Sequence, residues 1–392
     1  MVLEKRSAHW DIFCAVVDNY GDIGVTWRLA KQLAAEYQIE VNLWVDDLFS
    51  FQHILPDLDP NLSLQRYVGV NIYQWKQPLE AKYRPGHVVI EAFACELPNE
   101  VKQSLNEQHQ LAPSQVPIWL NLEYLSAESW VDGCHALPSL QSTGLKKHFY
   151  FPGFTQKSGG LICESSLIEQ RESWQANPQN RFKLFDSLGL KGIETGHQVI
   201  SLFSYENSVL LSLCQYLQQN SRPTHILVPK GRSLTSLQSL FPAPVEELAA
   251  GDRIQQGSLT IHILPMTDQQ AYDQLLWSCD FNIVRGEDSF LRAQWAAKPF
   301  IWHIYPQDED YHLVKLAAFL ERYTEKLPPM LKVLIDALNT NFNQELTSET
   351  IRNWHELQDL TPLLLQHAQN WPNDALNGSD LAERLVHFVK NG

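Results

Sequence analysis

One stretch decides how this chain folds: Asp18-Asn19-Tyr20-Gly21-Asp22-Ile23-Gly24, residues 18–24. An apolar run, 12–17, precedes it, and in the following segment, 25–34, apolar residues recur at helical spacing. The pattern predicts a strand, a tight turn that contains glycine, and a helix. Such a turn presents backbone N–H groups at a helix N-terminus, where an anion or the polar edge of a substrate can bind. Its two carboxylates, Asp18 and Asp22, favour proton chemistry or a cationic substrate over phosphate binding.

Short apolar runs alternate with helical patterns through the first half of the chain, at residues 41–45, 88–90 and 118–122. Alternation of strands and helices predicts a parallel sheet wrapped by helices. Such sheets bind ligands beyond the carboxyl ends of their strands. Glu91 and Glu123 fall at these ends together with the acidic turn, so we expect them to converge on one cleft. Structural hydrogen bonding is the favoured role for the two glutamates.

The alternation is lost between about residues 135 and 195, and a domain junction is expected there. Strands then resume, with a spacing that predicts a second parallel sheet, at residues 199–203, 225–228, 259–264, 281–284 and 300–304. After residue 304 the pattern is mostly helical. We therefore expect an N-terminal Rossmann-like domain over 1–180 and a C-terminal Rossmann-like domain over 181–365. A helical segment, 366–392, would pack back towards the N-terminal domain.

The second informative stretch runs from Asn282 to Trp295 and again predicts a strand, a glycine turn and a helix. Asp288 or Ser289 is the expected helix cap. Arg285, at the end of the strand, can bind phosphate oxygens through two parallel hydrogen bonds. A helix N-terminus, a hydroxyl and an arginine together predict a diphosphate site. Two α/β domains that face each other across a cleft, one with an acidic turn and one with a diphosphate site, have the layout of a GT-B glycosyltransferase.

The composition excludes several classes of function. With 45 acidic residues against 30 Lys and Arg, the chain has a formal net charge of −15, which argues against nucleic acid and anionic membranes as partners. Its six cysteines lie at least 29 residues apart, which fits neither a zinc site nor a compact disulfide framework and favours a reducing cytoplasm. No apolar run approaches the roughly 18 residues of a membrane span, and Asp11 interrupts the first apolar stretch. We therefore expect neither a membrane helix nor a signal peptide.

These motifs resemble the bacterial elongation factor P arginine rhamnosyltransferases, the EarP family. The blocks that carry the resemblance are 18–24, 28–30, 90–95, 121–126, 157–162, 285–290 and 302–309. They are long, unusual in sequence and spread over most of the chain. The resemblance implies an inverting GT-B enzyme that moves L-rhamnose from dTDP-β-L-rhamnose to one arginine of elongation factor P, in its N-terminal acceptor domain. This modification activates the factor to rescue ribosomes stalled at polyproline.

The resemblance also implies roles for single residues. Its catalytic carboxylates correspond to Asp18, Asp22 and Glu287. The donor-binding residues carried over by motif are Asn19, Tyr20, Gly21, Tyr205, Met266, Gln269, Tyr272, Arg285, Gly286, Asp288 and Ser289. Met266 departs from the family, which often has Phe at this position, although a methionine can also cover the face of a base. Neither a metal nor another cofactor is implied.

The chemistry suits these residue types. A guanidinium is a poor nucleophile, because its lone pairs are delocalised and its pKa is roughly 13. Carboxylates can orient it, localise its charge and take its proton. We expect Asp22 to be the base, Asp18 to orient the guanidinium or support Asp22, and Glu287 to act from the second domain. No metal is needed if Arg285 and the helix N-terminus stabilise the charge of the leaving group.

Simpler interpretations remain open at this stage. An aspartate in a strand–helix turn is often only a cap, and Asp288 could serve as an N-cap alone. A nicotinamide oxidoreductase is an alternative, since Asp46 lies where a ribose-binding acid would be expected, although the turn lacks the G-x-G-x-x-G fingerprint. A non-enzymatic acidic module that binds a basic partner would explain the charge but not Arg285. Titration with dTDP and with NAD distinguishes the three.

Overall fold

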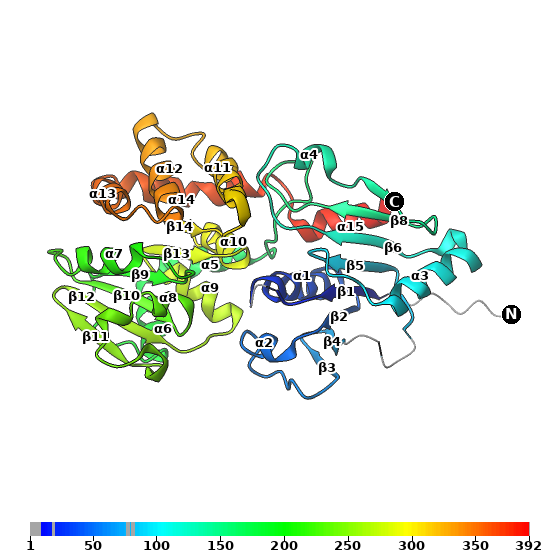
Figure 1. Ribbon diagram of the computed structural model, residues 1–392, viewed down its shortest axis with the longest axis horizontal. Coiled ribbons are helices and arrows are strands. Elements are labelled where there is room, and N and C mark those ends of the chain that lie inside the picture. Colours follow the sequence, from blue (N-terminus) through cyan, green and yellow to red (C-terminus); the bar gives the residue numbers. More distant parts are fainter. Residues whose placement is uncertain (1–8, 18–19, 76–78, 80–82, 392) are drawn as a thin grey trace. The chain divides into compact units, whose positions relative to one another are not determined.

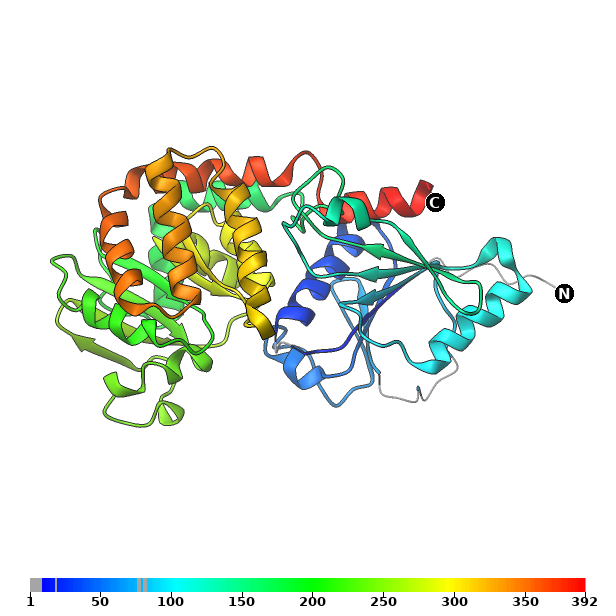
Figure 2. The same ribbon diagram turned by 45° about the horizontal axis from the view of Figure 1, so that its top comes forward.

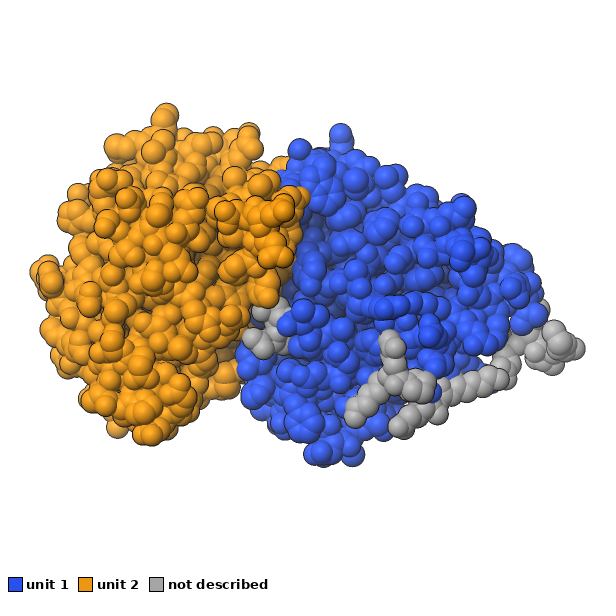
Figure 3. Space-filling view, in the orientation of Figure 1, with its two compact units in different colours: residues 1–165, 375–392 blue, residues 166–374 orange. Residues whose placement is uncertain are grey.

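The computed structural model describes residues 9–17, 20–75, 79 and 83–391. The chain forms two compact units, coloured separately in Figure 3. The first unit comprises residues 1–165 and 375–392, and the second comprises 166–374. No helix among the described residues is long and apolar enough to cross a membrane.

The first unit is built on a sheet of eight strands (Figure 1). In chain order they are β1 (Trp10–Cys14), β2 (Val41–Val45), β3 (Leu64–Tyr67), β4 (Val70–Gln74), β5 (Val88–Ala92), β6 (Ile118–Leu122), β7 (Pro138–Leu140) and β8 (Lys146–Tyr150). The order across the sheet is β3-β4-β2-β1-β5-β6-β8-β7, with β3 and β7 antiparallel to their neighbours and the other pairings parallel. Its helices are α1 (Gly21–Tyr37), α2 (Leu48–Gln52), α3 (Asn99–Leu111), α4 (Val131–Cys134) and α15 (Leu381–Asn391). Strand β1 is buried along its whole length, because helices cover both faces of the sheet.

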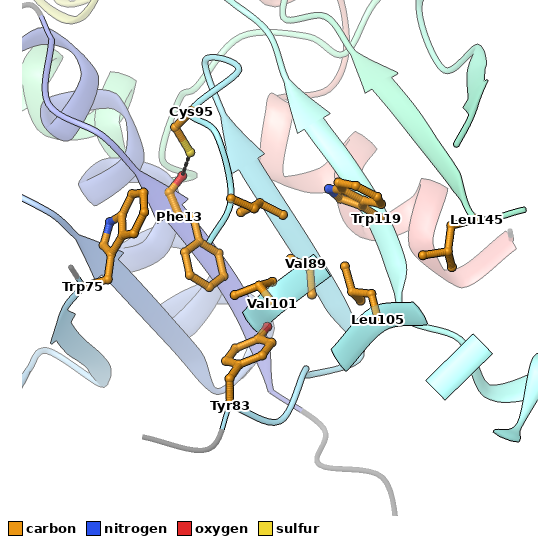
Figure 4. Close-up of a cluster of buried hydrophobic side chains, with 10 residues drawn as sticks. Phe13, Trp75, Tyr83, Val89, Cys95, Val101, Leu105, Trp119 and Leu145 are labelled. Atoms are coloured by element: carbon orange, nitrogen blue, oxygen red, sulfur yellow. Dashed lines mark hydrogen bonds between the residues drawn. The ribbon is translucent and has the colours of Figure 1, made fainter. Parts of the chain in front are cut away.

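The core of the first unit between α3 and the sheet is drawn in Figure 4. Phe13, Val89 and Trp119 come from three neighbouring strands and pack with Val101 and Leu105 of α3. The strands in this core are apolar on both faces, as the short apolar runs in the sequence predicted for a parallel sheet. Helices α1 and α15 contact each other in the same unit (Figure 2).

The second unit has a six-stranded sheet. Its strands are β9 (Gln198–Leu202), β10 (Thr224–Pro229), β11 (Arg253–Gln256), β12 (Leu259–Leu264), β13 (Phe281–Arg285) and β14 (Phe300–His303). They lie in the order β11-β12-β10-β9-β13-β14, all parallel except β11. The helices are α5 (Leu167–Ala176), α6 (Pro178–Ser187), α7 (Val209–Leu217), α8 (Arg232–Thr235), α9 (Gln269–Ser278), α10 (Asp288–Trp295), α11 (Tyr311–Tyr323), α12 (Pro329–Asn343), α13 (Thr347–Gln358) and α14 (Thr361–Leu376).

Two sheets of mainly parallel strands, each covered by helices, confirm the α/β prediction and the pair of Rossmann-like domains that defines GT-B architecture. The five strands expected in the second domain are all present, within one or two residues of their expected ends. The sequence analysis did not identify the edge strands β3, β7 and β11. These strands are short and alternate between exposed and half-buried residues, so they lack the apolar run by which the central strands were found.

The observed unit boundaries differ from those expected at residues 180 and 365. Helix α5 belongs to the second unit, because Trp174 donates a hydrogen bond to Ser278 over 3.0 Å and Gln175 donates to the carbonyl of Trp277 over 3.1 Å. Helix α15 belongs to the first unit. There the Arg384 guanidinium donates to the carbonyl oxygens of Thr155, at 2.6 Å, and Ser158, at 3.0 Å.

Candidate functional site

The second unit has a topological switch point between β9 and β13. The chain moves from β9 to β10 and β12 on one side of the sheet and to β13 and β14 on the other. The loops that leave the carboxyl ends of β9 and β13 therefore diverge and leave room for a ligand. Tyr205 lies three residues beyond β9, and Arg285 is the last residue of β13.

Arg285 is held by aromatic rings at this switch point. Its guanidinium carbon lies 4.5 Å from the centre of the Phe203 ring and 4.8 Å from that of the Tyr205 ring. Arg285 is only 7% exposed. Stacking on two rings fixes the guanidinium plane without neutralising its charge. The structure thus brings together two residues, Tyr205 and Arg285, that the sequence assigned separately to the donor site.

The turn after Arg285 is shaped by local hydrogen bonds. Ser289 donates its hydroxyl to the Arg285 carbonyl and accepts a hydrogen bond from the Arg285 N–H at 3.2 Å. Gly286 has a φ of 61°, a left-handed conformation that glycine adopts without strain, and its carbonyl accepts a hydrogen bond from the Trp302 indole at 2.8 Å. Helix α10 begins at Asp288 with Glu287 in the N-cap position. The expectation that Asp288 or Ser289 is the cap was therefore wrong by one or two residues, because the Ser289 hydroxyl closes the preceding turn.

Helix α9 adds further donor-site candidates. Gln269 and Tyr272 lie in its first turn, after Asp268, which caps the helix by accepting a hydrogen bond from the Ala271 N–H at 2.7 Å. The Tyr272 ring meets Phe203 edge-on at 5.9 Å. Burial raises the pKa of the Tyr272 hydroxyl, so this group stays protonated and can donate a hydrogen bond.

A buried ion pair joins the two helices that hold these residues. Arg292 of α10 donates two hydrogen bonds to the carboxylate of Asp273 in α9, at 2.9 and 2.6 Å. Both side chains are buried. The bidentate geometry fixes α9 against α10 and hence the first turns of both helices relative to each other.

His303 lies beside the loop that carries Tyr205. Its Nδ1 is 2.6 Å from the Ser204 hydroxyl, and its ring meets the Tyr205 ring edge-on at 5.2 Å. Burial, followed by the charge of Arg285, lowers the pKa of His303 to about 3, so the imidazole is neutral at physiological pH. Because His303 is buried and neutral, it is not suited to act as an acid or a base in the reaction.

Three further residues lie beyond the carboxyl ends of this sheet. Met266, predicted to cover the donor base, lies two residues beyond β12 and is 44% exposed. Tyr305, beyond β14, meets the Tyr205 ring edge-on at 5.4 Å. Arg232, beyond β10, has its guanidinium carbon 5.2 Å from the centre of the Tyr205 ring. Sequence reasoning missed Tyr305 and Arg232, although each follows a strand that was predicted, which was the available signal.

The first unit has its own switch point, between β1 and β5. The turn after β1 leads into α1, where Gly21 is the first residue and Asp22 the second. Asp22 is 2% exposed; its carboxylate accepts hydrogen bonds from the Val17 N–H at 2.9 Å and the Tyr124 hydroxyl at 3.3 Å. Tyr20 occupies the N-cap position of α1. Asp18 and Asn19, both assigned to the site from the sequence, lie outside the described residues.

Other carboxylates at this edge are engaged by neighbouring groups. Glu91 pairs with Lys147 at 3.2 Å, and Glu123 accepts a hydrogen bond from the Asn121 amide. Both thus make the structural hydrogen bonds that the sequence favoured. Asp46 accepts a hydrogen bond from the Val16 N–H at 2.9 Å. Because this bond ties Asp46 to the turn after β1, the structure gives no support to a ribose-binding role for it. Among the residues that the structure describes, no group of three or more His, Cys, Asp or Glu could hold a metal ion.

Comparisons with known proteins give a consistent result. The family model described as elongation factor P (EF-P) rhamnosyltransferase EarP matches residues 10–390. A protein-arginine rhamnosyltransferase of Shewanella oneidensis is 60% identical over 393 residues and covers 100% of both chains. One of Pseudomonas aeruginosa is 46% identical and covers 97% of this chain and 98% of its own. A solved structure on the structural basis for EarP-mediated arginine glycosylation of translation elongation factor EF-P matches with a TM-score of 0.69 and 34% identity, covering 98% of this chain and 100% of the other.

Proposed function

The chain belongs to the EarP family of elongation factor P rhamnosyltransferases, and from this premise we propose that it transfers L-rhamnose from dTDP-β-L-rhamnose to one arginine side chain of elongation factor P, with inversion at the sugar. One observation supports this proposal most: the buried Arg285 guanidinium, stacked on Phe203 and Tyr205 beside the start of α10. A fixed cation next to a helix N-terminus is suited to a nucleoside diphosphate.

In this mechanism the second unit holds the donor. Arg285 and the first N–H groups of α10 bind the diphosphate, and they stabilise the negative charge that develops as the glycosidic bond breaks. The protonated Tyr272 hydroxyl and Gln269 contribute further hydrogen bonds, and Met266 covers the thymine. Since these groups carry the charge of the leaving dTDP, the scheme requires neither a metal nor another cofactor.

The carboxylates activate the acceptor arginine. Asp22 is the general base, because inversion requires a base on the face of the sugar opposite the diphosphate. The hydrogen bonds from Val17 and Tyr124 hold its two oxygens in place, and a carboxylate oriented in this way can accept the guanidinium proton. Asp18 orients the guanidinium or supports Asp22. Glu287, beside the diphosphate-binding turn, is the third carboxylate of the reaction.

The acceptor is the N-terminal domain of elongation factor P, and the reaction takes place in the cytoplasm, where this factor acts on ribosomes. The modified factor then rescues ribosomes stalled at polyproline.

Intact-mass analysis tests the proposal directly. The full chain is incubated with elongation factor P and dTDP-L-rhamnose, and the acceptor should gain the mass of one deoxyhexose. Fragmentation should locate it on a single arginine. A control reaction in which the acceptor arginine is replaced by lysine should give no product, because lysine lacks the guanidinium that the carboxylates orient. An unchanged mass for the natural acceptor would refute the proposal.

A further inference from the structure

A second guanidinium lies beside the ring that supports Arg285. The guanidinium carbon of Arg232 is 5.2 Å from the centre of the Tyr205 ring, compared with 4.8 Å for Arg285. The side chain of Arg232 is 45% exposed, whereas Arg285 is buried. Arg232 Nε is paired with the carboxylate of Glu206 at 2.6 Å, and the side chain of Glu206 is 48% exposed. The ring of Tyr205 therefore carries one fixed cation and one accessible cation.

The backbone around Arg232 is tied to the loop that carries Tyr205. The hydroxyl of Ser233 donates to the Ser204 carbonyl at 2.8 Å and accepts from the Ser204 N–H at 2.7 Å. The Ser236 hydroxyl accepts from the Asn207 N–H at 3.0 Å. These bonds fix the loop after β10 against the loop after β9. Arg232 is thus kept beside Tyr205 by buried contacts, although its own side chain is open to solvent.

Both arginines act on the same neutral imidazole. After burial, the charges of Arg285, His312 and Arg232, in decreasing order, lower the pKa of His303. Two guanidinium groups around one aromatic ring repel each other, and an anion near them offsets this repulsion. Glu206 supplies one such anion, but an exposed ion pair contributes little to stability and is readily exchanged.

From this arrangement we propose that Arg232 is a second diphosphate-binding residue, and that Glu206 is the counter-ion which the diphosphate of the donor displaces from it. A guanidinium offers a planar fork that matches phosphate oxygens, and a diphosphate carries more charge than one carboxylate. Arg285 then binds the diphosphate from a fixed position, while Arg232 closes on it from the solvent side. This inference rests on the proposed function, since it assumes that a nucleoside diphosphate occupies the switch point of the second unit.

Calorimetric titration of the full-length protein with dTDP tests the inference. Arg232→Ala should weaken dTDP binding by about tenfold at low salt, because a charge-assisted hydrogen bond in a partly exposed site is lost. The loss should shrink as the salt concentration rises. Arg222→Ala is the matched control, because it removes the same charge at a different place. Arg222 precedes β10 instead of following it, and its side chain donates a hydrogen bond to the Gly196 carbonyl at 2.8 Å. Its dTDP affinity should equal that of the natural protein.

Glu206→Gln tests the competition between carboxylate and diphosphate. This variant should bind dTDP about two- to threefold more tightly, because Arg232 no longer has to leave a charged partner. In the Arg232→Ala background the same change should have no effect, since Glu206 acts through Arg232. Arg232→Lys keeps the charge but not the planar fork of the guanidinium, so its dTDP affinity should lie between those of Arg232→Ala and the natural protein. It replaces the alanine variant if thermal unfolding shows that Arg232→Ala is misfolded.

The outcomes separate this inference from the function on which it rests. If Arg232→Ala binds dTDP within twofold of the natural protein while Arg285→Ala binds it poorly, Arg232 has no part in binding and the donor site at Arg285 stands. If Glu206→Gln raises dTDP affinity equally with and without Arg232, the proposed displacement of Glu206 from Arg232 is wrong, because the Glu206 carboxylate then only repels the diphosphate through its negative charge. If the natural protein itself fails to bind dTDP, both the inference and the proposed donor are wrong.

Discussion

Asp22 is almost completely buried, and both oxygens of its carboxylate accept hydrogen bonds, from the Val17 N–H and from the Tyr124 hydroxyl. Tyr124 is 41% exposed, and its ring stacks on that of Phe93 at 4.6 Å. The contacts of Asp22 therefore extend to a side chain that reaches solvent. A carboxylate fixed in this way can hold the nitrogen of an incoming guanidinium in one orientation.

At the scale of this residue, we predict that Asp22→Asn lowers turnover by about a hundred- to ten-thousand-fold, the usual cost of removing a general base. The amide keeps the shape of the side chain, so dTDP affinity should be unchanged or slightly higher. Steady-state kinetics beside dTDP titration measures both. Asp47→Asn is the control. Asp47 caps α2 by accepting from the Ser50 N–H, and asparagine is an equally good cap, so turnover should be retained. Near-normal turnover of Asp22→Asn would make Asp18 the next candidate for the base.

Arg285 leads to a prediction on the donor side. Arg285→Ala should weaken dTDP binding by about ten- to a hundredfold, since a buried charge-assisted contact is lost. It should leave the binding of elongation factor P nearly intact. Titration with each ligand separately makes the comparison, with Arg253→Ala as a control; Arg253 is an exposed arginine that donates to the Lys191 carbonyl. Equal loss of both ligands would show that the variant is misfolded or that the donor site lies elsewhere.

At the scale of secondary-structure elements, three histidines connect neighbouring segments of the second sheet. His197 Nδ1 lies 2.9 Å from His225 Nε2, and His225 Nδ1 lies 3.0 Å from His262 Nε2. The latter two belong to β10 and β12, and His197 precedes β9. Burial lowers the pKa of both His225 and His262 to about 4, assisted by nearby charges that include Arg253. Neutral rings can each donate to the next, whereas a protonated ring would face another donor.

This row of histidines predicts a pH dependence of stability. The folded-state pKa of about 4 for His225 and His262 lies below the value of 6.5 expected in the unfolded chain. As the pH falls, protons therefore bind to the unfolded state first. The contribution of these two histidines to the free energy of unfolding is fully present above pH 6.5 and is lost as the pH falls towards 4. The melting temperature should drop as the pH falls over this range. It should drop less steeply for His262→Gln, because glutamine cannot be protonated. His387→Gln is the control. His387 lies on the exposed face of α15, so the melting temperature of this variant should depend on pH as that of the natural protein does. An unchanged slope for His262→Gln would contradict the prediction.

At the scale of the whole molecule, the net charge of −15 affects the choice of partner. Selection of one arginine from a folded protein requires contacts beyond the guanidinium, and an acidic protein favours a basic surface around it. We predict that short peptides with the acceptor arginine are modified about a hundredfold less efficiently than the folded acceptor domain. Such peptides lack those contacts and lose conformational entropy when they become ordered on binding. Comparison of kcat/KM for the two acceptors tests this. Similar values would mean that recognition is confined to the arginine itself.

The sequence by itself determined the class of the fold and the positions of most central strands. The reason is local: a buried parallel strand is a short apolar run, and the helix that follows it has apolar residues at a period of about 3.6. The same local patterns predicted strand–helix junctions after β1 and after β13, because glycine and acidic or hydroxyl side chains mark such a junction. Helix α1 begins at Gly21, within the stretch predicted as a turn. The unusual motifs at these turns were specific enough to indicate the family, which the comparisons show.

Only the tertiary structure decided which side chains meet. Tyr124 lies 102 residues from the Asp22 carboxylate that it contacts, and Arg232 of α8 and Arg285 of β13 reach the ring of Tyr205 from different elements. Contacts of this kind depend on strand order, which no local pattern contains. The membership of α5 and α15 in the two units has the same origin, since it depends on hydrogen bonds and packing against segments distant in the sequence. Local periodicity specifies an element, whereas burial against the rest of the chain specifies its neighbours.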